Sequence, residues 1–337
     1  MALRFMDGFD HYQSADFLTK WTSLTQNGVE LAISATGGRY GGGCLSMANP
    51  RSGVTLSLDS QATWLLNFAM KVGAGTPSAT TILGLLDTGT LHMDLRINAA
   101  RQLYVTRNAT TLGAAGSTAL TADVWYWIGV KFTIDDSAGV AQVQINGVDE
   151  INLTAQDTRN AAASSANQIR LGQVSNIALA FSLDDFVLMD GQAGMNALLA
   201  NRRIWTTDPV AAGNSAQWTG TPGANWANVH ASVPSAVGPV NYASVAGYKD
   251  TFVFEDAPAA SGNVEAIQHV VYAKHDGAAR SIRTLERVSG TDYTGATQAL
   301  ASSYKYYRQI REVNPATSSK FTVAEFNGAE FGYELVS

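Results

Sequence analysis

Apolar and polar residues alternate with a period of two along most of the first 190 residues. Every second residue is apolar in LHMDLRIN (residues 91–98), and WYWIGVKFTI (residues 125–134) repeats the pattern. Successive side chains of a strand point to opposite faces, so each segment predicts a half-buried strand. The dipeptide Asn146-Gly147 lies between VAQVQI and VDEINLT and indicates a tight hairpin turn. Strands this frequent, with no amphipathic helix between them, predict a two-sheet sandwich.

The pattern changes after about residue 192. Residues 193–248 are rich in Ala, Gly, Asn and Pro, and five of the eight prolines of the chain lie between residues 209 and 258. Proline cannot donate to a strand ladder, so this segment is expected to be extended and irregular. It also holds Trp205, Trp218 and Trp226, which favour an ordered segment wrapped on a neighbouring domain or subunit.

Strand patterns return after residue 248, in stretches such as DTFVFED and EAIQHVVYAKHD. The sequence therefore predicts an all-β chain in three parts: a β-sandwich over residues 1–192, an ordered wrap over 193–248, and a second, smaller β-sandwich domain over 249–337. No heptad or internal repeat is present in the sequence, so a fibre shaft is not expected.

Composition narrows the class of protein. The chain has 337 residues, of which 46% are hydrophobic and 15% charged, and its net charge of −6 disfavours nucleic-acid binding. Cys44 is the single cysteine, so no internal disulfide can form. No apolar run reaches the length of about 18 residues that a membrane span needs. Arg4 and Asp7 interrupt the apolar residues at the start, so we expect no secretory signal and synthesis in a cytoplasm.

Catalytic patterns are sparse. A glycosidase needs two carboxylates that flank the scissile bond. The first 192 residues contain two glutamates, Glu30 and Glu150, in no such pattern, and Asp184 and Asp185 are adjacent, which places them on opposite faces of a regular strand. No G-x-S-x-G motif is present, and the glycines before Cys44 lack the Lys and Ser/Thr of a phosphate-binding loop. We therefore expect that the protein is not an enzyme. A glycan depolymerase is the weakest of the three functions considered, after a structural protein and a carbohydrate-binding module.

Aspartates at the two ends of the first domain form the one candidate metal site. Asp7 and Asp10 would meet Asp184 and Asp185 if the first and last strands are neighbours, and carboxylates suit Ca²⁺. The alternative is that these aspartates cap turns and protect strand edges, with no cofactor bound.

Three consecutive aromatic residues, Trp125, Tyr126 and Trp127, raise the question of a binding surface. At least one ring must point away from the core side of the strand, and an exposed Trp can stack on a sugar or anchor a protein partner. The alternative is that both faces of the sheet are covered at this point. Trp125 and Trp127 are therefore the candidates for glycan or partner contact.

Three segments carry a family resemblance: FMDGFDHY at the start, FSLDDFVLMD near residue 185, and the hairpin WYWIGVKFTIDDSAGVAQVQINGVDE between them. Together they resemble concanavalin A-like or laminin-G-like jelly rolls. The opening is also similar to that of tailed-bacteriophage virion proteins, in which a Trp- and Pro-bearing segment and a second β-domain follow the sandwich. The resemblance implies that Phe5, Phe9 and Tyr12 seal the sandwich beside FSLDDFVL, while Asp7 and Asp10 hold the local turn and edge.

The resemblance predicts a structural component of a tailed-phage virion, on the exterior of the tail or baseplate or attached to the capsid. Symmetric copies and other virion proteins would dock through Trp205, Trp218 and Trp226, and the sandwich would face host surface glycans. The alternative is a carbohydrate-binding, lectin-like receptor-recognition module, which predicts an exposed aromatic platform with Asn and Asp side chains around it.

Overall fold

The computed structural model describes residues 2–25, 31–48, 52–75, 79–172, 179–192, 196–230 and 238–337. These residues form mainly antiparallel sheets, as the sequence predicts, and the chain divides into Met1–Ile204, the first unit, and Trp205–Ser337, the second unit. Within the described residues, no helix has the length and apolar character needed to cross a membrane.

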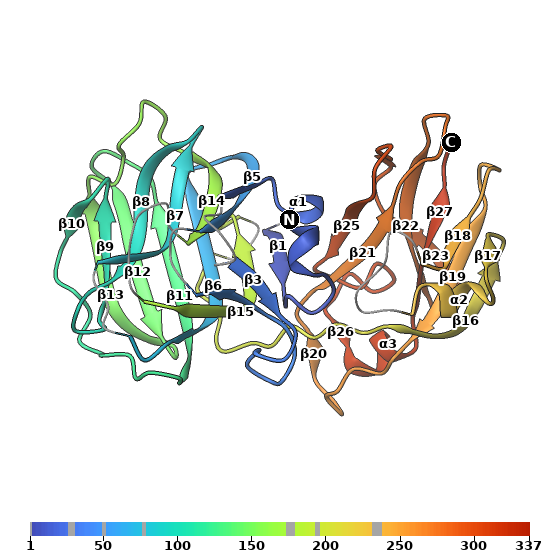
Figure 1. Ribbon diagram of the computed structural model, residues 1–337, viewed down its shortest axis with the longest axis horizontal. Helices are drawn as coiled ribbons and strands as arrows, with labels where there is room; N and C mark the ends of the chain where they lie inside the picture. The colour runs from blue at the N-terminus through green and yellow to red at the C-terminus, as the bar shows by residue number, and fades with distance from the viewer. Residues whose placement is uncertain are drawn as a thin grey trace. The chain divides into compact units, whose positions relative to one another are not determined.

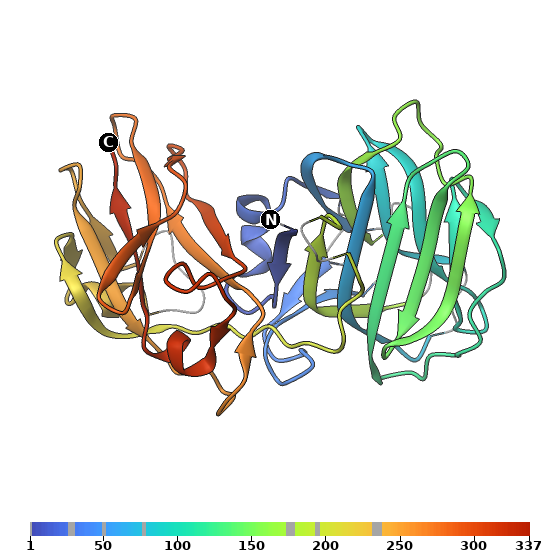
Figure 2. The same ribbon diagram turned by 180° about the vertical axis from the view of Figure 1, so that it is seen from behind.

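In its described part, the first unit is a sandwich of two sheets, which lie face to face in Figures 1 and 2. One sheet has the order β13-β12-β11-β6-β15-β4-β3, with β1 paired to β15. Its strands are β1 (Leu3–Asp7), β3 (Leu31–Ser34), β4 (Cys44–Met47), β6 (Thr63–Val72), β11 (Trp125–Thr133), β12 (Gly139–Ile145), β13 (Val148–Gln156) and β15 (Phe181–Met189).

The facing sheet has the order β10-β9-β8-β7-β14-β5-β2. Its strands are β2 (Ser23–Thr25), β5 (Gly53–Gln61), β7 (Thr80–Asp87), β8 (Thr90–Ile97), β9 (Leu103–Arg107), β10 (Thr110–Leu112) and β14 (Ala166–Gly172). A short 3₁₀ turn, Ser14–Asp16, and α1 (Phe17–Lys20) follow β1. The alternating apolar positions expected in residues 91–97 and 126–134 include Met93, Leu95, Val130 and Phe132, which are fully buried.

Two sequence predictions about pairing are confirmed. The hairpin of β12 and β13 turns at Asn146 and Gly147, which have φ of 51° and 84°. Positive φ at both positions is the geometry that makes Asn-Gly the favoured two-residue turn. The first and last strands of the sandwich are neighbours, because β1 pairs with β15 and places Asp7 opposite Phe186.

The second unit packs a sheet of order β16-β19-β27-β22-β23, with β24 paired to β22, against the β21–β25 ribbon (Figure 1). Val271 and Tyr307 of the ribbon are buried with Phe252, Ile282 and Tyr333 of the sheet. The sheet strands are β16 (Pro209–Ala216), β19 (Lys249–Phe254), β22 (Ser281–Val288), β23 (Thr291–Thr294), β24 (Gln298–Ala299) and β27 (Glu330–Leu335).

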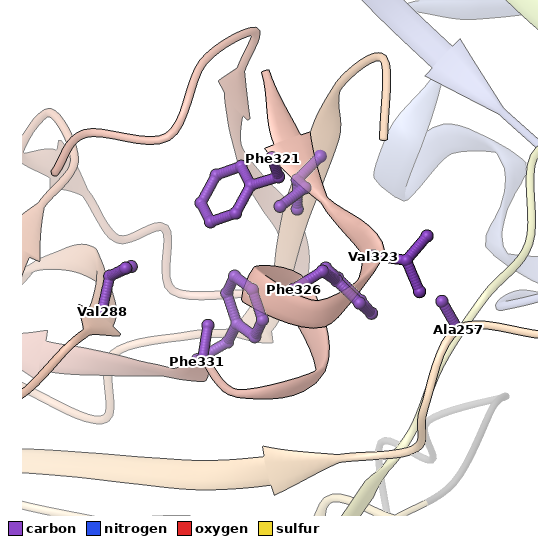
Figure 3. Close-up of a cluster of buried hydrophobic side chains, with 8 residues drawn as sticks. Ala257, Val288, Phe321, Val323, Phe326 and Phe331 are labelled. Carbon is purple, nitrogen blue, oxygen red and sulfur yellow. The ribbon is translucent and has the colours of Figure 1, made fainter. Parts of the chain in front are cut away.

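Smaller elements complete the second unit. They are β17 (Thr219–Thr221), α2 (Asn225–Asn228), β18 (Val240–Tyr242), β20 (Asn263–Val264), β21 (Ile267–Ala273), β25 (Lys305–Arg311), β26 (Phe321–Thr322) and α3 (Val323–Asn327). Helix α3 begins at a capping box, in which Thr322 and Glu325 bond each other's backbone N–H. Its Phe326 packs on Phe331 of β27, with ring centroids 5.5 Å apart (Figure 3).

The segment expected to be an irregular wrap, residues 193–248, differs from that prediction. Its residues 193–195 and 231–237 lie outside the described residues. Within the rest, β16 pairs with β19 and forms an edge of the sheet. Pro209 is the first residue of that edge strand, a position where a missing N–H costs little. The division of the chain into two units falls between Ile204 and Trp205, whereas the sequence predicted boundaries after residues 192 and 248.

Candidate functional site

The connection between β3 and β4 brings glycine backbone against the end of β1. We call residues 37–43, with the sequence GGRYGGG, the glycine loop. The N–H of Gly43 donates to Asp10 Oδ1 at 2.6 Å, and a Cβ at Gly43 would lie 2.2 Å from the carbonyl oxygen of Phe9. A side chain at this position would therefore push the loop away from the turn after β1.

Asp7, in the opening stretch of the chain, is part of a buried ion pair. Lys20 Nζ lies 2.9 Å from Asp7 Oδ1, and both side chains are at most 1% exposed. Tyr12 Oη donates to Asp7 Oδ2 at 3.0 Å, and Trp21 Nε1 donates to Tyr12 Oη at 3.0 Å. The carboxylate is thus held by protein donors, which stabilise the local turn.

The pair Asp184–Asp185 departs from a regular strand. The register between β15 and β6 shifts between Asp184 and Val187, and Asp185 has φ of 52°. This β-bulge interrupts the regular alternation of the strand at the two aspartates, and the charge of Asp185 acts on Asp184. Sequence periodicity contains no signal for such a bulge.

Backbone amides from distant segments bind the two carboxylates. Asp184 Oδ2 accepts from the N–H of Arg39 at 2.7 Å, and Asp185 Oδ1 accepts from the N–H of Ile204 at 2.6 Å. Arg39 Nη1 lies 3.5 Å from Asp185 Oδ2, an oxygen with no hydrogen-bond partner. Both aspartates are buried, with exposures of 6% and 1%.

Burial changes the acidity of these groups. Burial, and next the charge of Asp185, raise the pKa of Asp184 to about 7. Burial also raises the pKa of Asp185 to about 6, against the opposing effects of the Ile204 amide and Arg39. The pKa of Asp10 is raised by burial as well, and its charge adds to the rise at Asp184. We call Asp10, Asp184 and Asp185 the carboxylate cluster.

The proposed Ca²⁺ ligands have other partners. Asp7 binds Lys20, and the carboxylate cluster binds backbone amides and lies near Arg39 and Arg203. Asp190, a fifth aspartate near the same strand, accepts from Arg4 Nη1 at 2.8 Å. The described part of the chain contains no group of three or more His, Cys, Asp or Glu side chains arranged to hold a metal ion.

The chain leaves the sandwich through residues 196–204, which we call the strap. The N–H of Leu199 donates to Asn67 Oδ1 at 2.9 Å, and Trp127 Nε1 donates to the carbonyl oxygen of Leu199 at 2.9 Å. Farther along, Arg39 Nη1 donates to the carbonyl oxygen of Arg202 at 3.3 Å. The strap therefore covers β6 and β11 on the face away from the sandwich core.

This covering decides one of the two predicted aromatic contacts. Trp127 is 1% exposed beneath the strap, so it cannot make the predicted glycan or partner contact, and the alternative of a covered face is correct there. Trp125 is half-buried, and the ammonium group of Lys71 lies over its ring, 5.1 Å from the centroid.

The most exposed residues of the site, Tyr40 and Arg203, were not selected by sequence reasoning. Tyr40, in the glycine loop, is 50% exposed. The guanidinium carbons of Arg39 and Arg203 lie 5.0 Å and 4.5 Å from its ring centroid. Arg203 belongs to the strap and is exposed, and its charge lowers the pKa of Asp10. A tyrosine within a run of glycines was the one available signal in the sequence, since binding residues often lie on loops held by a rigid scaffold.

The three tryptophans predicted to mediate assembly pack within the second unit. Trp205 is partly buried against the cluster of Figure 3, and Trp218 and Trp226 pack against the cluster that contains Tyr333. The rings of Trp218 and Tyr333 meet edge to face, with centroids 4.7 Å apart. These contacts give the tryptophans a role within the chain, and their role in assembly stays a prediction.

No protein-family model matches the chain, and no curated protein does. Among solved structures, a sialidase is 13% identical with a TM-score of 0.43, covering 57% of this chain and 19% of its own. The cellulose-induced protein Cip1 is 12% identical with a TM-score of 0.42, covering 55% of this chain and 96% of its own.

Domain 4 of AbnA, a GH43 extracellular arabinanase from Geobacillus stearothermophilus solved with arabinotriose, is 15% identical with a TM-score of 0.37, covering 56% of this chain and 94% of its own. The similar part of this chain thus spans about a fifth of the sialidase. At these TM-scores no argument about function follows. None of these comparisons supports the resemblance to phage virion proteins, which stays a prediction.

Proposed function

We propose that the first unit is a glycan-binding module and that Tyr40, Arg203 and Asp10 contact the sugar. The observation that carries the proposal is the half-exposed ring of Tyr40 beside the exposed guanidinium group of Arg203. A sugar ring presents apolar C–H groups and hydroxyls that both donate and accept. Tyr40 supplies an amphipathic surface, Arg203 supplies donors, and the partly exposed carboxylate of Asp10 supplies an acceptor.

Hydrogen bonds from backbone N–H groups hold the residues of the site in position. Asp10 is held by the N–H of Gly43, and the glycine loop is held to the bulge by the Arg39–Asp184 bond. Groups held in this way lose little conformational freedom on binding, which favours affinity.

We test the proposal with a glycan array on the full chain, followed by titration of any glycan that binds. The variants Tyr40→Ala and Arg203→Ala should each weaken binding by about tenfold or more, which equals about 1.4 kcal/mol. Tyr242→Ala is the matched control, because Tyr242 is 55% exposed and belongs to the second unit. No binding to any glycan, or equal loss in Tyr40→Ala and Tyr242→Ala, would refute the proposal.

We also propose that the module binds without turnover. Asp184 and Asp185 have raised pKa values, as catalytic acids often do, yet both are buried and their oxygens accept from backbone amides. Chromatography of a bound oligosaccharide after incubation with the protein should show one unchanged peak. Shorter products that disappear in Asp184→Asn would establish a hydrolase or lyase instead.

The phage resemblance supports a more specific version, in which the module sits on the exterior of a tailed-phage particle and recognises host glycans. Light scattering of the purified chain tests its assembly part. A discrete trimer or hexamer would support docking between symmetric copies. A monomer at all concentrations would rule out that docking and would not affect the proposal of a glycan-binding module.

A further inference from the structure

The bulge of β15 joins two segments that are far apart in the chain. The glycine loop is tied to it by the N–H of Arg39 on Asp184, and the strap by the N–H of Ile204 on Asp185. The guanidinium group of Arg39 then links the loop to the strap through the carbonyl oxygen of Arg202. One pair of adjacent carboxylates therefore fastens both segments that carry the exposed residues of the site.

When both carboxylates of the pair are ionised, negative charges outnumber positive charges among the groups around the bulge. The other anion is Asp10, after β1, and the cations are Arg39 of the glycine loop and Arg203 of the strap. The second oxygen of Asp185 has no hydrogen bond, and Arg39 Nη1 lies 3.5 Å from it. Two like charges in a buried site cannot both be held without cost, so the pair favours a state that retains a proton.

Groups on the other elements around the bulge change this balance little. Burial, and next the charge of Asp184, raise the pKa of the Cys44 thiol on β4, so that thiol stays neutral, while Lys71 of β6 opposes the shift. Lys20 of α1 and Asp7 of β1 act on Asp10, and they already form an ion pair with each other.

We propose that Asp184 and Asp185 form a proton-operated latch, which fastens the glycine loop and the strap to β15 while the pair retains a proton and loosens them when both carboxylates ionise. The raised pKa values of about 7 and about 6 place this change between mildly acidic and mildly alkaline solution. Tyr40 lies on the loop and Arg203 on the strap, so loosening would separate the proposed sugar contacts. That consequence rests on the proposed function, whereas the latch itself does not.

Amide hydrogen exchange of the full chain, corrected for intrinsic rates, tests the latch at about pH 5.5 and about pH 8. The protection of the Arg39 and Ile204 amides should fall by about tenfold at the higher pH, because a latch held less tightly opens more often. The amides of β12, away from the bulge, should keep their protection. Equal protection of Arg39 and Ile204 at the two pH values would overturn the proposal, whatever the glycan experiments show.

Asp185→Asn is the variant of choice. Its Oδ1 can still accept from Ile204, and its new amide replaces the oxygen that has no hydrogen-bond partner. The pair then never carries two charges, so the change should fall well below tenfold, and only the part that burial imposes on Asp184 should remain. Asp59→Asn, at a 59% exposed carboxylate, should keep the change seen in the unsubstituted protein. Persistence of the full tenfold change in Asp185→Asn would refute the latch.

A titration of the unsubstituted protein keeps the proposal testable if Asp185→Asn fails to fold. The carboxyl ¹³C signal of Asp184, followed by NMR, should have its midpoint near 7. A midpoint near the ordinary aspartate value of about 4 would overturn the proposal, because both carboxylates would then be ionised throughout the range of the exchange experiment.

Discussion

Lys20 and Asp7 form an ion pair, 2.9 Å from Nζ to Oδ1, in the interior of the first unit. The ammonium group also lies over the ring of Tyr12, 4.7 Å from its centroid. The opening stretch of the chain is therefore a structural corner that closes the sandwich next to the candidate site, and its polar residues are held by one another.

Removing one partner of this pair should strongly destabilise the first unit. Lys20→Met leaves the Asp7 carboxylate buried without its cation, and we expect a loss of about 3–5 kcal/mol. Urea unfolding followed by circular dichroism measures the change. Asp157→Asn is the control, since it removes a partner of Arg107 from an exposed pair and should cost less than about 1 kcal/mol. Similar losses in both variants would contradict the structural role of the buried pair.

His11 should make the first unit sensitive to acid. Burial, with a further effect of the Lys20 charge, lowers the pKa of His11 to about 3, below its ordinary value of 6.5. The unfolded chain therefore takes up a proton first as the pH falls, and stability is lost below about 6.5.

The variant His11→Gln removes this dependence. Its free energy of unfolding should decline less than that of the unsubstituted protein between about pH 7 and about pH 5, by on the order of 1 kcal/mol. The latch aspartates act in the opposite direction, because their raised pKa values favour the folded state at lower pH. The comparison between the two proteins cancels that contribution. Parallel stability curves would contradict the assignment to His11.

The bond from Trp127 Nε1 to the carbonyl oxygen of Leu199 should hold the strap in place. Trp127→Phe removes the donor, so the strap should open more often and trypsin should cut after Arg202 or Arg203 several times faster. Mass spectrometry of timed digests measures this rate. Trp125→Phe serves as the control, because the ring of Trp125 is half-buried and contacts the ammonium group of Lys71 on β6. It should leave the rate unchanged. Unchanged cleavage in Trp127→Phe would show that the bond does not restrain the strap.

A variant of Trp218 can distinguish a role of this residue within the chain from a role in assembly. Trp218→Ala removes the edge-to-face contact with Tyr333 and should destabilise the second unit by about 2–4 kcal/mol, as for other large side chains that are truncated against a core. If its role is confined to the chain, the mass measured by light scattering below the unfolding temperature should stay the same. A folded variant that loses an oligomeric state would instead support the predicted assembly interface.

The local sequence determined the strands of this protein and one of its turns. Alternation in LHMDLRIN and WYWIGVKFTI produced β8 and β11, because side-chain period and strand pleat are the same local property. Asn146-Gly147 produced its turn for a similar reason, since few other residues tolerate positive φ at two successive positions. The neighbouring positions of β1 and β15, and the role of Asp10 in a turn, could also be anticipated from the sequence.

The tertiary structure alone decided where the chemistry of the site lies. The bulge at Asp185 depends on its pairing with β6 and on contacts with Arg39 and Ile204, and Arg39 is 145 residues away from Asp184. The sequence left open whether Trp127 is exposed or covered, because nothing in its own strand shows that the strap covers it. Strand periodicity reports which side chains alternate, whereas burial, pKa and the meeting of the glycine loop with the strap depend on segments that only the folded chain brings together.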